Sequence, residues 1–161
     1  MADEPTNGGT GGTPQQQLSI HSIYLKDASF ESPAAPGIFQ TQAQPNIQIN
    51  VGINTQQIAD DAHEVLLTVT ATAKLADEKT AFLAEVHQGG VFTLRGFTKD
   101  ELGPMLGIYC PNVLFPYARE AVANLVSKGG FPPLMLQPVN FEALYSQHLQ
   151  RQRQPTGDTV Q

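Results

Sequence analysis

The chain has 161 residues, which is enough for one domain with a hydrophobic core that folds without cross-links. Its formal net charge of -6 and its nine scattered Lys and Arg residues argue against a nucleic-acid or anionic-membrane partner, because both need clustered basic side chains. The single cysteine, Cys110, excludes an intramolecular disulfide, and the lack of a long apolar run and of a basic, apolar N-terminal signal leads us to expect a cytoplasmic protein.

Residues 1–17 are mainly Gly, Thr, Gln and Pro, with no large apolar residue beyond the first methionine. Such a segment buries too little surface to offset the entropy cost of ordering its backbone, so we expect a disordered tail. Residues 18–27 alternate with apolar side chains on both faces, which predicts a strand. We place the domain at residues 18–150, and the polar residues 151–161 predict a flexible C-terminal tail.

The most unusual stretch extends from Ser32 to Ala59: it has no Lys, Arg, Asp or Glu, yet it contains seven large apolar residues. Three prolines and a glycine interrupt its first half, so no helix extends through it and strand pairing there is short or at an edge. An uncharged, apolar segment of this kind predicts an ordered lining for an apolar binding surface. Residues 47–53 either pair at a sheet edge or line that surface alone.

Residues 65–74 and 80–88 both alternate with a period of two, and a short polar turn at 77–79 separates them. This arrangement predicts a β-hairpin. The Gly89–Gly90 pair then interrupts the pattern, which resumes at 91–94. We therefore expect a bulge or sharp bend followed by a fourth, short strand.

Thr98 followed by Glu101 forms a capping box, and Pro104 limits the helix that begins there to a turn or two. A longer helix is predicted from Pro111 to the Gly129–Gly130 pair. Its apolar residues repeat at helical spacing, namely Val113, Leu114, Tyr117, Ala121, Leu125 and Val126.

A last helix begins after Asn140, a residue suited to cap it. Its apolar face comprises Phe141, Leu144, Tyr145, His148 and Leu149. Strands followed by helices predict an α+β fold: a four-stranded antiparallel sheet with a long crossover loop and two main helices packed on one face. Because the strands have apolar residues on both faces, we expect the chain to form an oligomer.

Little in the sequence indicates catalysis. The four histidines lack metal-ligand spacing, and Cys110 has no neighbouring Cys or His, so we expect neither a metal site nor a cofactor. Cys110 lies at a helix start, where a lowered pKa would make it a nucleophile, but burial at a helix contact is the simpler interpretation. We therefore expect that the protein is not an enzyme.

Three acidic residues lie at or beside strands, next to apolar residues. Asp27 and Glu31 flank Phe30, and Glu85 follows Leu83 on the same face. Acidic side chains beside exposed apolar surface are suited to dock a basic partner. Ordinary charge on an edge strand is the alternative interpretation.

Five segments of the chain resemble SecB, the bacterial protein-export chaperone family: IYLKDASFESPAAPGIFQ at 23–40, EVLLTVTATAKL at 64–75, TAFLAEVHQGGVF at 80–92, YCPNVLFPYARE at 109–120 and FPPLMLQPVNFEALY at 131–145. The resemblance implies an ATP-independent holdase that binds unfolded precursor proteins, keeps them translocation-competent and delivers them to the SecA motor of the Sec translocon. It also implies a homotetramer, assembled as a dimer of dimers, with no nucleic-acid partner, no direct membrane insertion and no metal of its own.

The resemblance further implies roles for individual residues. It assigns SecA binding to Asp27, Glu31, Leu83 and Glu85. It assigns binding of unfolded peptides to Ile38, Phe39, Ile47, Ile49, Val51, Leu144 and Leu149. It assigns the oligomer interface to Tyr109, Cys110, Leu114, Tyr117 and Ala121.

Two other functions stay open at this point. One is a SecB-like chaperone that guards a specific antitoxin. The other is a small-molecule-binding or hydrolytic α+β oligomer with a pocket at its interface, which would need titratable residues that converge in a cleft.

Overall fold

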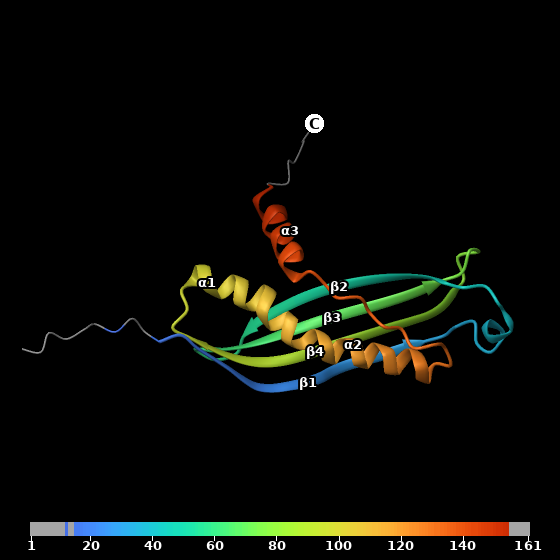
Figure 1. Ribbon diagram of the computed structural model, residues 1–161, viewed down its shortest axis with the longest axis horizontal. Helices are drawn as coiled ribbons and strands as arrows, with labels where there is room; N and C mark the ends of the chain where they lie inside the picture. Colours follow the sequence, from blue (N-terminus) through green and yellow to red (C-terminus); the bar gives the residue numbers. More distant parts are fainter. Residues whose placement is uncertain (1–11, 13–14, 155–161) are drawn as a thin grey trace, which may run out of the picture.

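The computed structural model describes residue 12 and residues 15–154 of the chain. The predicted tails at 1–17 and 151–161 fall largely outside the described residues. Where the predicted tails overlap the described residues, the structure is regular: Gln17 belongs to the first strand, and residues 151–153 are helical. The α+β fold itself is confirmed (Figure 1).

The strands form one antiparallel sheet in the order β1-β4-β3-β2 (Figure 1). They are β1 (Gln17–Glu31), β2 (Asn46–Gln57), β3 (Ala62–Lys74) and β4 (Thr80–Arg95). The chain crosses from one edge of the sheet to the other between β1 and β2, through a loop that contains the short turn η1 (Gly37–Gln40). The predicted long crossover therefore ends at Pro45, and the second half of the uncharged stretch is a regular edge strand.

The predicted number of strands is correct, but the fourth strand is β2 and not the segment after the glycine pair. Gly89 and Gly90 lie inside β4, which continues to Arg95. A Cβ atom at Gly89 would lie 2.4 Å from the ring of Tyr24 on β1, and one at Gly90 would lie 2.8 Å from the ring of Phe92. The glycines make room for aromatic rings, and register shifts in the pairing of β1 with β4 flank them, between Ile20 and Ser22 and between Leu25 and Asp27.

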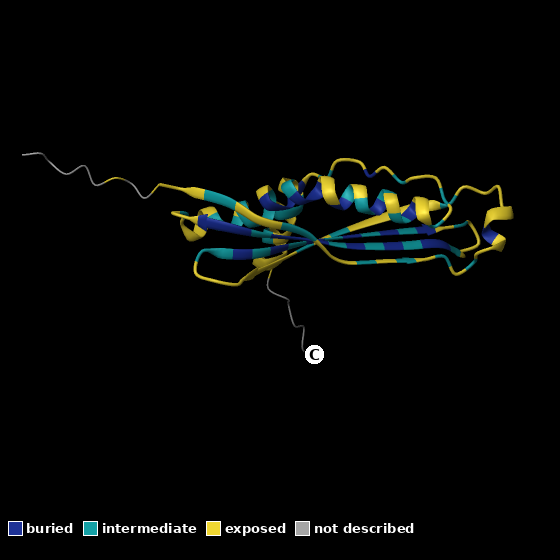
Figure 2. Ribbon diagram, turned by 90° about the horizontal axis from the view of Figure 1, so that it is seen from below, coloured by how far each residue is buried: buried dark blue, intermediate teal, exposed yellow. Residues whose placement is uncertain are grey.

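The core lies between the central strands and α2 (Cys110–Lys128). On β3, Val65, Leu67 and Val69 are fully buried and alternate with partly exposed residues. The side of α2 that faces the sheet is also fully or largely buried, at Cys110, Pro111, Leu114, Phe115, Ala118, Val122 and Val126. Figure 2 shows the helix on one side of the sheet, with alternating burial along the strands.

The capping box before α1 (Lys99–Pro104) is confirmed: the Glu101 N–H donates to Thr98 Oγ1 at 3.3 Å, and the Thr98 N–H donates to Glu101 Oε2 at 2.8 Å. As predicted, α1 is short and ends at Pro104, but the chain does not leave the helical conformation there. A wide turn, η2 (Met105–Tyr109), leads directly into α2, and the Cys110 N–H donates to the Met105 carbonyl, five residues back. Proline has no backbone N–H to donate, and a widened turn of this kind is one way in which a chain stays helical beside a proline.

The last helix, α3 (Phe141–Arg153), begins where the sequence predicts, because Asn140 Oδ1 accepts a hydrogen bond from the Ala143 N–H at 3.0 Å. Only Phe141 is buried in this helix. Figure 1 shows α3 extending outward past β2 instead of lying along the sheet as α2 does. No helix within the described ranges is long and apolar enough to cross a membrane.

Candidate functional site

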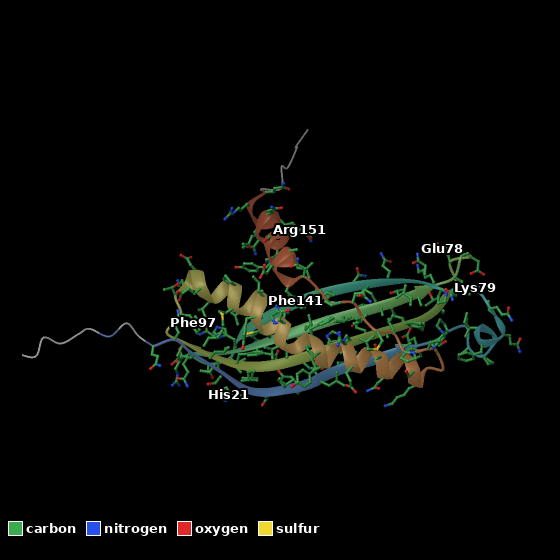
Figure 3. All side chains as sticks on the ribbon, viewed as in Figure 1. His21, Glu78, Lys79, Phe97, Phe141 and Arg151 are labelled. Atoms are coloured by element: carbon green, nitrogen blue, oxygen red, sulfur yellow. The ribbon has the colours of Figure 1, made fainter. Side chains whose placement is uncertain are left out.

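A groove of about 1190 Å³ lies between β2 and the C-terminal part of the chain. One wall is β2, with Ile47, Ile49 and Val51. The other wall comes from η2, from the extended segment 134–140 and from α3. Figure 3 shows α3 rising from Phe141 at its base to Arg151 near its outer end. Arg151 is the only Lys, Arg, Asp or Glu among the described residues that line the groove.

Pairing with β3 explains why β2 presents apolar side chains to the groove. Ile47 pairs with Ala73 and Ile49 pairs with Ala71, so both isoleucines point to the face of the sheet that bears the core. Because β2 has a neighbour on only one side, these two side chains remain 38% exposed. The result is an apolar ledge beside a free strand edge, where unpaired backbone groups are available to an extended peptide.

Four of the predicted peptide-binding residues meet in the groove: Ile47, Ile49, Val51 and Leu144. Ile38, Phe39 and Leu149 do not line it. Ile38 is part of the core, at 8% exposed.

Phe39 belongs instead to an aromatic cluster at the crossover end of the sheet. Its ring centroid lies 5.4 Å from that of Phe131, which in turn lies 4.9 Å from that of Phe82. Phe82 and Ile47 both pair with Ala73, so this cluster is separated from the start of the groove by a single strand. Phe39 is half exposed and adds apolar surface beside the groove.

The sequence analysis missed the wall opposite β2. Leu134, Met135 and Leu136 line the groove, and Met135 is 62% exposed. Residues 129–141 contain no Lys, Arg, Asp or Glu and include three prolines. Residues 32–59 were identified by the same two features, a lack of charge and several prolines in an apolar segment. The second wall could therefore have been predicted in the same way.

The face of the sheet opposite α2 has no helix on it among the described residues; we call it the open face (Figure 2). Register places Glu31 opposite Leu83 and Ser29 opposite Glu85. Ala84 between them is fully buried, so its neighbours along β4 point to the open face. Asp27, Glu31, Leu83 and Glu85 thus lie together on the β1–β4 pair, and we call this group the acidic patch.

Within the acidic patch, the Glu85 carboxylate has two hydrogen-bond partners. His87 Nε2 lies 2.7 Å from Glu85 Oε1, and Thr70 Oγ1 donates to Glu85 Oε2 at 3.1 Å. The hydrogen bond with His87, and then that from Thr70, lower the pKa of Glu85, so this carboxylate stays ionised to lower pH than usual. Its negative charge is fixed in position on the sheet.

A second charged cluster lies farther along the open face. The Tyr24 hydroxyl donates to the Glu64 carboxylate, and Lys26 Nζ lies 2.9 Å from Glu64 Oε1. The hydrogen bond from Tyr24 is the main cause of a lowered pKa for Glu64, while burial is the main cause that raises the pKa of Tyr24 to about 12. This cluster is internally compensated, which leaves the acidic patch as the more negative part of the face.

The residues of the predicted oligomer interface point in two directions. Cys110 and Leu114 are fully buried within their own chain, so neither side chain offers exposed surface to another subunit. Tyr109 and Tyr117 are 41% and 49% exposed, and Ala121 is partly exposed. Burial also raises the pKa of the Cys110 thiol to about 12, which removes the thiolate that a nucleophile requires.

The charged residues of the described ranges form no metal site, since no three of the His, Cys, Asp and Glu side chains there are arranged to hold an ion. The groove lining likewise offers His148 and Arg151 with no acidic residue beside them.

Residues 12–152 match the family model described as preprotein translocase subunit SecB. The protein-export protein SecB of Nitrosococcus oceani is 53% identical over 98% of this chain and 96% of its own length. That of Methylococcus capsulatus is 52% identical over 88% and 90%. A solved SecB-like chaperone from Mycobacterium tuberculosis, in complex with a peptide from the HigA1 antitoxin, shares the fold at a TM-score of 0.59 and 19% identity, over 76% of this chain and 91% of that one. The chain belongs to the SecB family of protein-export chaperones.

Proposed function

We propose that the chain is an ATP-independent chaperone of the cytoplasm that binds unfolded precursor proteins in the groove, keeps them competent for export and delivers them to SecA. The observation that supports this most directly is the apolar groove, which has an edge strand as one wall and no acidic side chain among the described residues that line it. Such a surface suits extended, apolar chains of many sequences.

The energetics favour clients that make several contacts. A micromolar dissociation constant corresponds to about 8 kcal/mol, whereas burying one large apolar side chain contributes roughly 1.5 to 3 kcal/mol before ordering costs. A client must therefore cover several of the apolar residues along β2 and the opposite wall. Folded proteins cannot present such a segment, so binding selects the unfolded state by mass action.

Delivery needs a second surface that a bound client leaves free. The acidic patch lies on the open face, whereas the groove lies beside β2 on the other side of the sheet. A basic surface on SecA would meet fixed carboxylates there, next to the apolar side chain of Leu83. Export is favoured over guarding an antitoxin because relatives at 46 to 53% identity are named protein-export proteins, while the antitoxin-bound chaperone shares only the fold.

The groove is tested by replacing both Ile47 and Ile49 with Asp. We expect the affinity for an unfolded precursor to fall about tenfold or more, because two apolar contacts are lost and two charges must be desolvated on binding. A matched control replaces Gln48 and Asn54 with Asp, on the same strand but on the open face and outside the groove lining. Suppression of aggregation of a denatured precursor measures the effect, and equal suppression by both variants would overturn the groove assignment.

The docking surface is tested independently by reversing Glu31 and Glu85 to Lys. We expect isothermal titration calorimetry to detect no SecA binding by this variant, while suppression of aggregation persists. Unchanged SecA affinity would overturn the docking role and leave the client-binding role intact.

A further inference from the structure

We propose that His87 makes docking at the acidic patch dependent on pH: gain of a proton by this side chain weakens the attraction of the patch for a basic partner without changing the fold. The inference rests on the docking role proposed above for the acidic patch. It concerns a residue to which neither the sequence nor the family resemblance gave a role.

His87 is surrounded by charged and polar groups on the open face. Glu85 lies on the same strand, 2.7 Å from His87 Nε2. Asp27 is its paired residue on β1, next to Lys26, and Thr68 is its paired residue on β3. The α2 helix contributes nothing here because it lies on the other face. A proton on His87 is therefore placed between two of the three carboxylates of the acidic patch.

The hydrogen bonds allow His87 to gain that proton in place. A carboxylate only accepts, so the Nε2 atom that contacts Glu85 already bears a proton in the neutral ring. The Nδ1 atom then accepts from the Thr68 hydroxyl, which lies 3.3 Å away. When Nδ1 is protonated, the same hydroxyl rotates and accepts instead, because a hydroxyl can play either role. Neither partner has to move, and the side chain is 27% exposed, so protons reach it from solvent.

Protonation changes what a basic partner meets. The formal charge of Asp27, Glu31 and Glu85 together with His87 falls from three negative charges to two. Glu85 also becomes the partner of an internal cation, which competes with any Lys or Arg from outside. Among protein side chains, imidazole is the one whose ordinary charge change falls between about pH 5 and 8.

Calorimetric titration of SecA into the full chain at about pH 7.5 and pH 6 tests the inference, with three variants that separate its components. We expect wild-type affinity to fall roughly two- to fivefold at the lower pH, the range of a single exposed charge pair. His87→Gln keeps a hydrogen-bond donor near Glu85 but cannot gain a charge, so its affinity should lose most of this dependence. His87→Lys has a permanent charge and should bind weakly at both values.

His21→Gln is the matched control, since His21 lies on β1, away from the acidic patch, and is hydrogen-bonded to Thr93 near the far end of the sheet. It should behave as wild type does, and titration of groups on SecA itself cancels in the comparison. Equal pH dependence in wild type and His87→Gln would overturn the role of His87 alone. Absence of SecA binding by the wild type at both pH values would overturn the docking proposal and this inference with it. Unchanged suppression of aggregation by each variant confirms that the fold is intact.

Discussion

At the scale of single residues, the Tyr24 and Glu64 pair connects β1 to β3 across the small surface of Gly89. The pKa of Glu64 is lowered from 4.5, so its ionised form stabilises the fold above that value and this contribution is lost as the pH falls through the lowered pKa. The pKa of Tyr24 is raised from 10.0 to about 12, so its contribution is present below pH 10 and is lost as the pH rises towards 12.

Replacing Tyr24 with Phe should therefore make stability less dependent on pH at both ends. The hydrogen bond to Glu64 disappears, and no hydroxyl remains to ionise in the unfolded chain. Chemical unfolding at neutral, acidic and alkaline pH measures this, with Tyr109→Phe as a control that removes an exposed hydroxyl elsewhere. Equal pH profiles for Tyr24→Phe and wild type would show that the pair contributes nothing.

Residue-scale features were only partly predictable from the sequence. The alternation in β3 and β4 predicted the two strands correctly, because a sheet with one covered face imposes a period of two on its sequence. The role of Gly89 was not predictable, since the ring that fills the space of a side chain at this position belongs to Tyr24, far away in the sequence. A glycine that admits a distant side chain and a glycine that bends the backbone look the same in one sequence.

At the scale of elements, α3 is held to the rest of the chain by the aromatic ring of Tyr145, which packs against two glycines. A Cβ atom at Gly103 would lie 2.4 Å from the Tyr145 hydroxyl oxygen, and one at Gly107 would lie 2.5 Å from the Tyr145 ring. The ring thus lies directly on the backbone of α1 and η2. Phe141, 6.0 Å from Phe115 between ring centroids, is the second anchor at the base of α3.

Gly107→Val should release α3 while leaving the sheet intact, because the new side chain occupies the space of the Tyr145 ring. We expect amide hydrogen exchange in α3 to accelerate by about tenfold or more, with exchange in β3 and β4 unchanged. Tyr145→Ala should give the same result without altering η2, and Gly37→Ala should have no effect because no atom lies within 4 Å of its added carbon. Unchanged exchange in α3 for both test variants would contradict this anchoring.

Two features of the elements were hard to predict from the sequence, each for its own physical reason. Residues 46–57 have a clear period of two, but the prolines before them favoured an irregular backbone for the whole uncharged stretch. The α2 helix is apolar on two sides, and helical spacing alone does not say which side faces the sheet. The family resemblance grouped Cys110 and Leu114 with Tyr109 and Tyr117, although the first pair is buried and the second is exposed.

At the scale of the whole molecule, apolar surface remains where β1 meets the outer side of α2. Leu25 is 52% exposed and Tyr117 is 49% exposed. A small cavity of about 170 Å³ between these elements is lined by Leu25 and Ala121. Exposed apolar side chains beside a sheet edge are suited to a contact with another subunit.

We expect light scattering to give a mass of about 70 kDa, that of four 17.4-kDa chains, for the wild type. Replacing Leu25 and Tyr117 with Asp should lower the mass to that of a dimer or monomer, because charges would be buried without partners. Met135→Asp is the control: its side chain is more exposed, at 62%, but it lies in the groove. A wild-type mass of one chain would contradict the tetramer.

None of the 12 residues of β2 is charged. The groove beside β2 and the acidic patch should therefore respond differently to ionic strength. Screening shortens the range of electrostatic attraction to about 8 Å at physiological ionic strength and to about 3 Å in 1 M salt. Apolar contacts along β2 are insensitive to this screening, and strongly excluded salts such as sulfate strengthen them. The attraction at the acidic patch fades under the same conditions. Concentrated salt should therefore stall the chaperone in a loaded state, with its client still bound and its transfer partner released.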